Sequence, residues 1–258
     1  TIYRIRPDGS GFESLHQFSE NQANLWTDYD GSGPVAALKA DVDGTLFGTT
    51  SGSGIGSGAL FGTLFKFDNN GFTLLDRYIM NWTEMFGAYD GLALSTNGAL
   101  YTTLYDGTST RLVGLPTNAP PCDRSGMPSF SVSTNLYTFA NYVSILGCPV
   151  IGGDGALYGG LMNYTDNIGA IYRLDPGTSP ATASFAYQFD TGESPSGGLT
   201  VGPDGALYGF SIKVGETTSW SIVRLDIAQS PATLSTLYTQ SVIDNQMPRG
   251  KLLYGVDG

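Results

Sequence analysis

The sequence of 258 residues predicts an all-β fold, a β-propeller with five blades of four antiparallel strands. Three observations lead to this prediction. One short phrase recurs every 50 to 57 residues, four strand-like runs follow one another within each interval, and no stretch shows a sustained period of 3.6 residues. The absence of that helical period excludes a helical solenoid. Two packed β-sandwich domains are the alternative, but sandwiches do not repeat internally in this way.

The recurring phrase predicts the first two strands of each blade. Four copies, at Asp43, Asn97, Asp154 and Asp204, combine Asp-Gly or Asn-Gly with a following apolar-aromatic pair, and a fifth begins at Asp257, so the copies lie near positions 43, 97, 154, 204 and 257. An apolar run precedes each copy. Asp-Gly between two apolar runs is a strong hairpin signal, for which we expect a tight turn with positive φ at both residues.

The third and fourth strands are predicted from two further recurring runs. The third carries a basic residue among apolar ones, at Ile2–Ile5, Leu64–Phe67, Ile171–Leu174 and Ile222–Leu225, with a weaker form at Arg111–Val113. The fourth ends in an aromatic residue, at Leu15–Phe18, Leu75–Tyr78, Leu136–Phe139, Tyr187–Phe189 and Leu237–Tyr238. Turns rich in Pro, Asp, Asn and Gly separate the two runs.

The order of the runs predicts one β-propeller domain over residues 1–258. The sequence opens with the third and fourth strands of one blade and ends after a first strand, so we expect a composite blade built from the N- and C-terminal segments. The second strand of this blade is not among the 258 residues. Three alternatives stay open: residues outside this sequence complete the blade, the blade has three strands, or the chain is a slice of a longer array.

The phrases at Asp154–Gly159, Gly169–Leu174 and Leu15–Phe18 resemble the GloVer tandem repeat of choice-of-anchor bacterial surface proteins. The resemblance covers essentially the whole chain. It implies a secreted, surface-anchored bacterial propeller, and it specifies an architecture rather than an activity. The third repeat departs from the family pattern because an insertion lies around Pro116–Pro128.

The composition narrows the classes of partner. The net charge is −11, and Lys and Arg together number 12, so the basic stripe that phosphate binding requires is missing and nucleic acid is not expected as a partner. No apolar run is long enough for a membrane helix, so we expect no membrane insertion. Charged residues make up 14% of the chain, a composition usual in extracellular β proteins, which favours an extracellular or cell-surface location.

Residues that recur at one blade position are expected to serve the architecture. The basic residues of the third strand, Arg4, Lys66, Arg173 and Arg224, predict a repeated pairing with a carboxylate of a neighbouring strand. The Asp of each Asp-Gly pair is expected to be a turn residue. His16 is the only histidine and aligns with Asp76, Tyr137, Tyr187 and Tyr238, so we expect an ordinary surface position without a catalytic triad.

Residues that break the repeat are the candidates for function. In a propeller the loops after the second and fourth strands share one face, and here those loops are long and contain aromatic and acidic residues. The candidate ligand-binding residues are Trp26, Asp28, Tyr29, Trp82, Glu84, Tyr89, Tyr164 and Asp166. An aromatic ring covers the apolar face of a sugar, while carboxylates and amides bind its hydroxyls. The pattern favours a binding or adhesion module for carbohydrate or a protein partner, although the tryptophans can also serve only to pack their own loops.

Two other functions stay open. A carbohydrate-active enzyme, a glycoside hydrolase or lyase, needs paired carboxylates, for which Glu84 with Asp28 or Asp90 are the candidates, but no motif supports a particular pair. A structural subunit of an extracellular assembly is the third hypothesis, because the incomplete blade can pair with another chain and allow self-assembly.

The sequence predicts no cofactor. Calcium is the weak exception, with Asp28 and Asp30 as its candidate ligands, although calcium needs six to eight oxygens. The cysteines, Cys122 and Cys148, leave a disulfide open. Blade geometry argues against it, because it places the two residues toward opposite faces of the propeller, and only the long insertion can bring them together.

Overall fold

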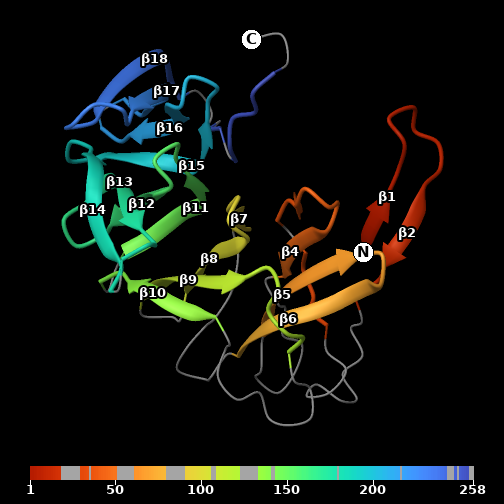
Figure 1. Cartoon of the computed structure of the whole chain (residues 1–258). Coiled ribbons are helices and arrows are strands. Elements are labelled where there is room, and N and C mark those ends of the chain that lie inside the picture. The colour runs from red at the N-terminus through yellow and green to blue at the C-terminus, as the bar shows by residue number, and fades with distance from the viewer. Residues whose placement is uncertain are drawn as a thin grey trace, which may run out of the picture. The chain divides into compact units, whose positions relative to one another are not determined.

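The computed structural model describes residues 1–18, 30–34, 36–50, 61–79, 91–105, 109–122, 133–140, 143–178, 180–215, 217–242, 247–248 and 250–255 (Figure 1). All regular elements within these ranges are β-strands, so the all-β prediction is confirmed. The strands form one two-stranded and four four-stranded antiparallel sheets. Nothing in the described part of the chain is a helix long and apolar enough to cross a membrane.

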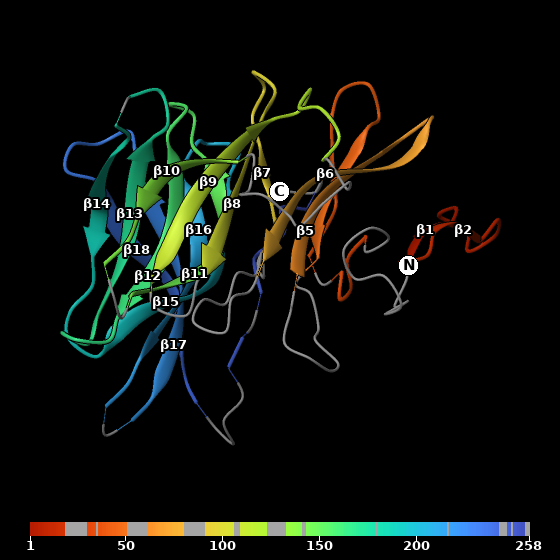
Figure 2. The ribbon, with the colours of Figure 1, turned by 90° about the horizontal axis from the view of Figure 1, so that it is seen from below.

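Each four-stranded sheet contains four strands that follow one another in the sequence (Figures 1 and 2). The N-terminal hairpin consists of β1 (Ile2–Arg4) and β2 (Glu13–His16). The next sheet consists of β3 (Lys39–Ala40), β4 (Leu46–Thr50), β5 (Phe61–Asp68) and β6 (Gly71–Ile79). It is followed by β7 (Ala93–Leu94), β8 (Ala99–Tyr105), β9 (Thr110–Pro116) and β10 (Thr134–Thr138).

The last two sheets have longer first strands. One consists of β11 (Val143–Ile151), β12 (Leu157–Asn163), β13 (Ile168–Asp175) and β14 (Thr182–Gln188). The other consists of β15 (Glu193–Val201), β16 (Leu207–Lys213), β17 (Ser219–Asp226) and β18 (Thr233–Ser241). The order of four strands per repeat agrees with the sequence, and the weak third strand at Arg111–Val113 is longer than expected because β9 extends to Pro116.

The chain divides into two compact units. The first unit comprises Thr1–Gly107 and Val113–Thr134, and the second comprises Thr108–Leu112 and Asn135–Gly258. A single domain over residues 1–258 therefore stays a prediction.

The Asp-Gly loops differ in one respect from the expected turn. Gly44, Gly98, Gly155 and Gly205 have φ between 76° and 84°, but the Asp or Asn before each has no positive φ. In the 152–156 loop, Gly155 N donates to Gly152 O at 3.0 Å and Gly152 N donates to Ala156 O at 2.9 Å. This is a three-residue loop, a type I turn followed by a left-handed glycine, so the expectation of positive φ at both residues was wrong.

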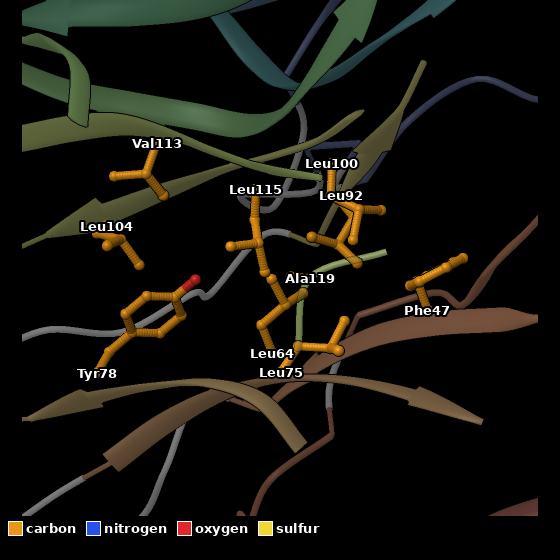
Figure 3. Packing of buried hydrophobic residues seen from close by; sticks show 10 residues of the cluster. All are labelled: Phe47, Leu64, Leu75, Tyr78, Leu92, Leu100, Leu104, Val113, Leu115 and Ala119. Carbon is orange, nitrogen blue, oxygen red and sulfur yellow. The ribbon is translucent and has the colours of Figure 1, made fainter. Parts of the chain in front are cut away.

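The core of the first unit lies between facing sheets. Leu64 on β5 and Leu75 and Tyr78 on β6 are buried together with Leu100 on β8 and with Val113 and Leu115 on β9 (Figure 3). A second cluster joins the N-terminal hairpin to the β3–β6 sheet, because Ile2 and Phe18 pack against Phe65. The β3–β6 sheet thus buries apolar side chains on both faces, as a sheet stacked between two others requires.

The core of the second unit also lies between two sheets. Tyr158 on β12 and Ile171 on β13 lie in one buried cluster with Leu207 on β16 and Leu225 on β17. The register pairs Leu207 with Leu225, so these two side chains share one face of the β15–β18 sheet. That face covers the β11–β14 sheet.

Glycines allow the first strands of successive repeats to approach each other. Gly147 in β11 and Gly197 in β15 have φ of 83° and 73°, and each lies at a register shift of its strand. A Cβ at Gly147 would overlap Gly198, and a Cβ at Gly197 would overlap the carbonyl oxygen of Gly250. Gly198 N donates to Gly250 O at 3.2 Å. Segment 250–255 therefore lies beside β15 as β15 lies beside β11.

Candidate ligand-binding loops

Most of the candidate site lies outside the described residues. Those residues are Trp26, Asp28, Tyr29, Trp82, Glu84, Tyr89 and Asp90. The structure describes Tyr164, Asp166 and Asp30. Tyr164 and Asp166 belong to the second unit, and Asp30 belongs to the first, so the two regions are described separately.

Tyr164 lies in the loop between β12 and β13, and side-chain hydrogen bonds define this loop. Asn163 Nδ2 donates to Asp166 Oδ2 at 2.9 Å, and Thr165 N donates to Asn163 Oδ1 at 2.9 Å. Asn167 is the one non-glycine residue with positive φ in the described part of the chain, at 54°. The Tyr164 side chain is 61% exposed. The loop thus presents an aromatic ring to solvent beside an amide and a carboxylate.

One neighbouring loop is hydrogen-bonded to the Tyr164 loop, and a third loop is hydrogen-bonded to that neighbour. Gly192 N donates to Asn167 O at 3.2 Å, and Val214 N donates to Gly192 O at 2.8 Å. Residues 163–167, 190–193 and 213–215 therefore form a continuous surface at one end of the two sheets, which we call the loop platform. The sequence prediction named Tyr164 and Asp166 but did not name Asp190 and Glu193 of the middle loop.

The middle loop adds fixed polar groups. Glu193 N donates to Asp190 O at 2.9 Å, and the Glu193 carboxylate accepts a hydrogen bond from the buried Ser211 hydroxyl at 2.9 Å. Burial, together with the charges of Glu193 and Asp190, raises the pKa of Tyr187 above its ordinary value. The loop platform therefore offers carboxylate oxygens and an exposed ring, and Tyr187 on the adjoining β14 offers a phenolic hydroxyl; these are groups that bind a neutral sugar.

His16 in the first unit is not the ordinary surface residue that the sequence predicted. Its Nε2 atom lies 2.8 Å from Asp30 Oδ2, with side chains 19% and 10% exposed. Its ring stacks on Phe72 with centroids 4.0 Å apart, and it meets the edge of Phe18. The prediction failed because Asp30 comes from a loop whose position the repeat does not specify. One carboxylate oxygen of the calcium candidate Asp30 is thus engaged by a histidine.

The recurring basic residues pair with carboxylates, as predicted. Arg173 donates to Asp154 Oδ2 through Nε at 3.1 Å and Nη2 at 2.9 Å, and the Tyr158 hydroxyl donates to the same oxygen at 2.9 Å. Burial and the hydrogen bond to Asp154 raise the pKa of Tyr158 to about 12. The next repeat reproduces the arrangement with Arg224, Asp204 and Tyr208. These turn aspartates therefore serve the sheets rather than a ligand.

In the first unit, the basic residue of the third strand pairs with a carboxylate that is closer to it in the sequence. Lys66 Nζ lies 3.3 Å from Asp68, and Arg4 pairs with Glu13 on the adjacent strand.

The two cysteines do not form a disulfide: Cys122 and Cys148 are both free thiols. Among the residues that the structure describes, no three His, Cys, Asp or Glu side chains are grouped so that they could hold a metal ion.

The described residues define an all-β repeat protein in which four-stranded antiparallel sheets pack against each other within each unit. No protein-family model matches the chain, and no curated protein matches it. The resemblance to the GloVer repeat therefore stays a prediction.

Two solved structures are similar in outline. An engineered GH43 glycoside hydrolase with endo-xylanase and exo-arabinofuranosidase activity has 14% identity and a TM-score of 0.43, over 89% of this chain and 45% of the enzyme. The chain thus spans less than half the length of that enzyme. A structure described as a putative oxidoreductase (glucose dehydrogenase) from Thermus thermophilus has 12% identity and a TM-score of 0.38, over 89% of both chains.

Proposed function

We propose that this chain is a secreted or cell-surface β-propeller that binds carbohydrate through the loop platform. The observation that carries the proposal is the exposed ring of Tyr164, which lies in a loop defined by Asn163 and Asp166 and hydrogen-bonded to the 190–193 loop. A rigid ring beside fixed polar groups suits a pyranose, because the ring covers its C–H face and the polar groups bind its hydroxyls.

The proposed architecture has five blades, one of them composite. It is supported by the stacking of sheets within each unit and by segment 250–255, which lies beside β15 in the place of a further first strand. The N-terminal hairpin supplies the third and fourth strands of the composite blade in this proposal. The likeness to GloVer repeats agrees with an extracellular protein of this kind.

The proposed ligand is a neutral glycan. Asp166, Asp190 and Glu193 give the loop platform an acidic character, and the chain as a whole has a net charge of −11. Both disfavour uronates and sulfated sugars. Trp26 and Trp82 lie outside the described residues and stay candidates from the sequence alone. No cofactor is part of the proposal.

A glycan array with matched variants tests the proposal. Tyr164→Ala and Asp166→Ala should each lower the signal for the bound neutral glycan by tenfold or more, since stacking and hydrogen bonding are lost. Phe185→Ala is the matched control, because Phe185 on β14 is also 61% exposed but lies outside the loop platform. The proposal fails if no glycan binds, or if Tyr164→Ala binds as well as Phe185→Ala does.

A further inference from the structure

The two sheets of the second unit differ at one pair of positions. In each sheet the first residue of the first strand lies opposite the last residue of the second strand, so the two sheets can be compared position by position. At the first residue of the first strand and two residues before the end of the second, the β11–β14 sheet has Val143 and Leu161, which are 9% and 3% exposed. The β15–β18 sheet has Glu193 and Ser211 there. A buried apolar pair in one repeat is thus replaced by a carboxylate and a hydroxyl in the next.

The buried hydroxyl of Ser211 fixes the Glu193 carboxylate. Ser211 is 1% exposed and donates to Glu193 Oε1 at 2.9 Å, while Glu193 itself is half-buried. The backbone of Glu193 is held as well, because its N donates to Asp190 O at 2.9 Å. The carboxylate therefore has a defined position before any ligand binds.

The polar pair is not what packing alone would select. A half-buried carboxylate loses part of its hydration, and apolar residues at such positions are often at least as stabilising. Lys213 lies directly opposite Glu193 in the register, yet no ion pair joins the two within the described part of the chain. Departures of this kind from a well-packed repeat are expected at functional positions.

Glu193 lies in the loop next to the Tyr164 loop. The residue before it, Gly192, donates from its N to Asn167 O at 3.2 Å, and Asn167 ends the turn that contains Tyr164. Backbone segments joined in this way lie about 4.8 Å apart. All of these residues belong to the second unit. One short glycan can therefore contact both the exposed ring of Tyr164 and the Glu193 carboxylate.

We propose that Glu193 determines the sugar specificity of the loop platform by accepting a hydrogen bond from one ligand hydroxyl, and that Ser211 is the positioning residue that holds its carboxylate. The inference rests on the proposed function, because it needs a sugar on the loop platform. It adds the group by which one neutral sugar is selected over another. A fixed acceptor rejects a ligand that lacks the matching hydroxyl, since the acceptor then loses its partner.

Nuclear magnetic resonance titrations of the whole chain test the proposal. The probes are the methyl glycosides of glucose, galactose, mannose and xylose, each with its monodeoxy derivatives. For a glycoside that binds the wild type, removal of one particular hydroxyl should weaken binding by about tenfold or more. In the Glu193→Val, Ser211→Leu double variant, which copies the apolar pair of β11 and β12, the same removal should change binding by less than about twofold.

The double variant separates selection from folding. Because it reproduces a pair that packs well in the preceding sheet, its urea midpoint should equal or exceed that of the wild type. Ser211→Ala should lose part of the selectivity, whereas Ser211→Thr, which keeps the hydroxyl, should retain it. Glu13→Gln removes an exposed carboxylate in the first unit and is the control that should select as the wild type does.

The outcomes distinguish this inference from the proposed function. The inference is wrong if the wild type binds every deoxy derivative as well as its parent, or if the double variant or Ser211→Ala selects as the wild type does. Binding that Tyr164→Ala abolishes would in that case still support the loop platform as the sugar site. A wild type that binds none of the glycosides also overturns the inference, and one that in addition binds nothing on the glycan array overturns the proposed function as well.

Discussion

Gly197 and Gly250 meet backbone to backbone, and a Cβ at Gly197 would overlap the Gly250 carbonyl oxygen. Gly197 also has φ of 73°, where an L-residue costs about 1–2 kcal/mol. Gly197→Ala should therefore lower the free energy of unfolding by more than about 2 kcal/mol, measured by urea denaturation.

Gly153→Ala is the control for Gly197→Ala. A Cβ there meets nothing within 4 Å, and Gly153 has no positive φ. Its effect should stay within about 0.5 kcal/mol. A cost of Gly197→Ala no larger than the about 1–2 kcal/mol of its positive φ would mean that segment 250–255 does not lie against β15 in solution.

Asp154 should make the protein sensitive to acid. Burial alone would raise the pKa of its carboxyl, but hydrogen bonds from Tyr158 and Arg173 hold the pKa below 3.8. Its contribution to stability is therefore complete above the unfolded-state pKa near 4 and is lost as pH falls through the lower folded-state value. The difference in unfolding free energy between wild type and Asp154→Asn should be constant from pH 7 to about 5 and shrink below pH 4. A difference that grows in acid would contradict this assignment.

His16 and Asp30 should anchor the N-terminal hairpin. Asp30→Asn removes a charged acceptor at 2.8 Å and should cost about 1.5–3 kcal/mol. In Asp30→Asn, amide hydrogen exchange in β1 and β2 should be faster than in the wild type, whereas exchange in β11–β18 should be unchanged. Glu13→Gln perturbs the exposed pair with Arg4 and should cost less than about 1 kcal/mol. Unchanged exchange in the Asp30 variant would show that the ring contacts of His16 alone hold the hairpin.

Ser133 should contribute to the stability of the fold through its contacts with Asp76 and Tyr78. Its backbone N donates to the buried Asp76 carboxylate at 3.0 Å, its hydroxyl donates to the same oxygen, and the Tyr78 hydroxyl lies 3.1 Å away. Ser133→Ala should cost about 1–3 kcal/mol by thermal or chemical denaturation. The exposed Ser184→Ala on β14 should be neutral. A neutral Ser133→Ala would show that Asp76 is satisfied without this hydroxyl.

The periodic features of the structure could be predicted from the sequence. Strand order, the glycines of the Asp-Gly loops and the pairing of Arg173 and Arg224 follow from repeated local signals. The contacts that residues at one position of the fourth strand make could not be predicted. His16, Asp76 and Tyr187 align, yet each meets a different partner because the neighbouring loops differ. The close approach of Gly197 to Gly250 was also missed, since a bulge has no signature beyond a glycine.

The candidate site was only partly predictable for the same reason. The aromatic–acidic composition identified Tyr164 and Asp166, which the structure places in one loop. Asp190 and Glu193 became visible only through the hydrogen bonds of Gly192, which join their loop to those on either side.

Affinity electrophoresis in gels containing neutral polysaccharides tests the central claim most directly. Migration of the wild type and of Phe185→Ala should be slowed in the gel that contains the ligand, whereas Tyr164→Ala should run as in a gel without polysaccharide. Unslowed migration of the wild type in every polysaccharide, or equal slowing of Tyr164→Ala and Phe185→Ala, would contradict sugar binding by the loop platform.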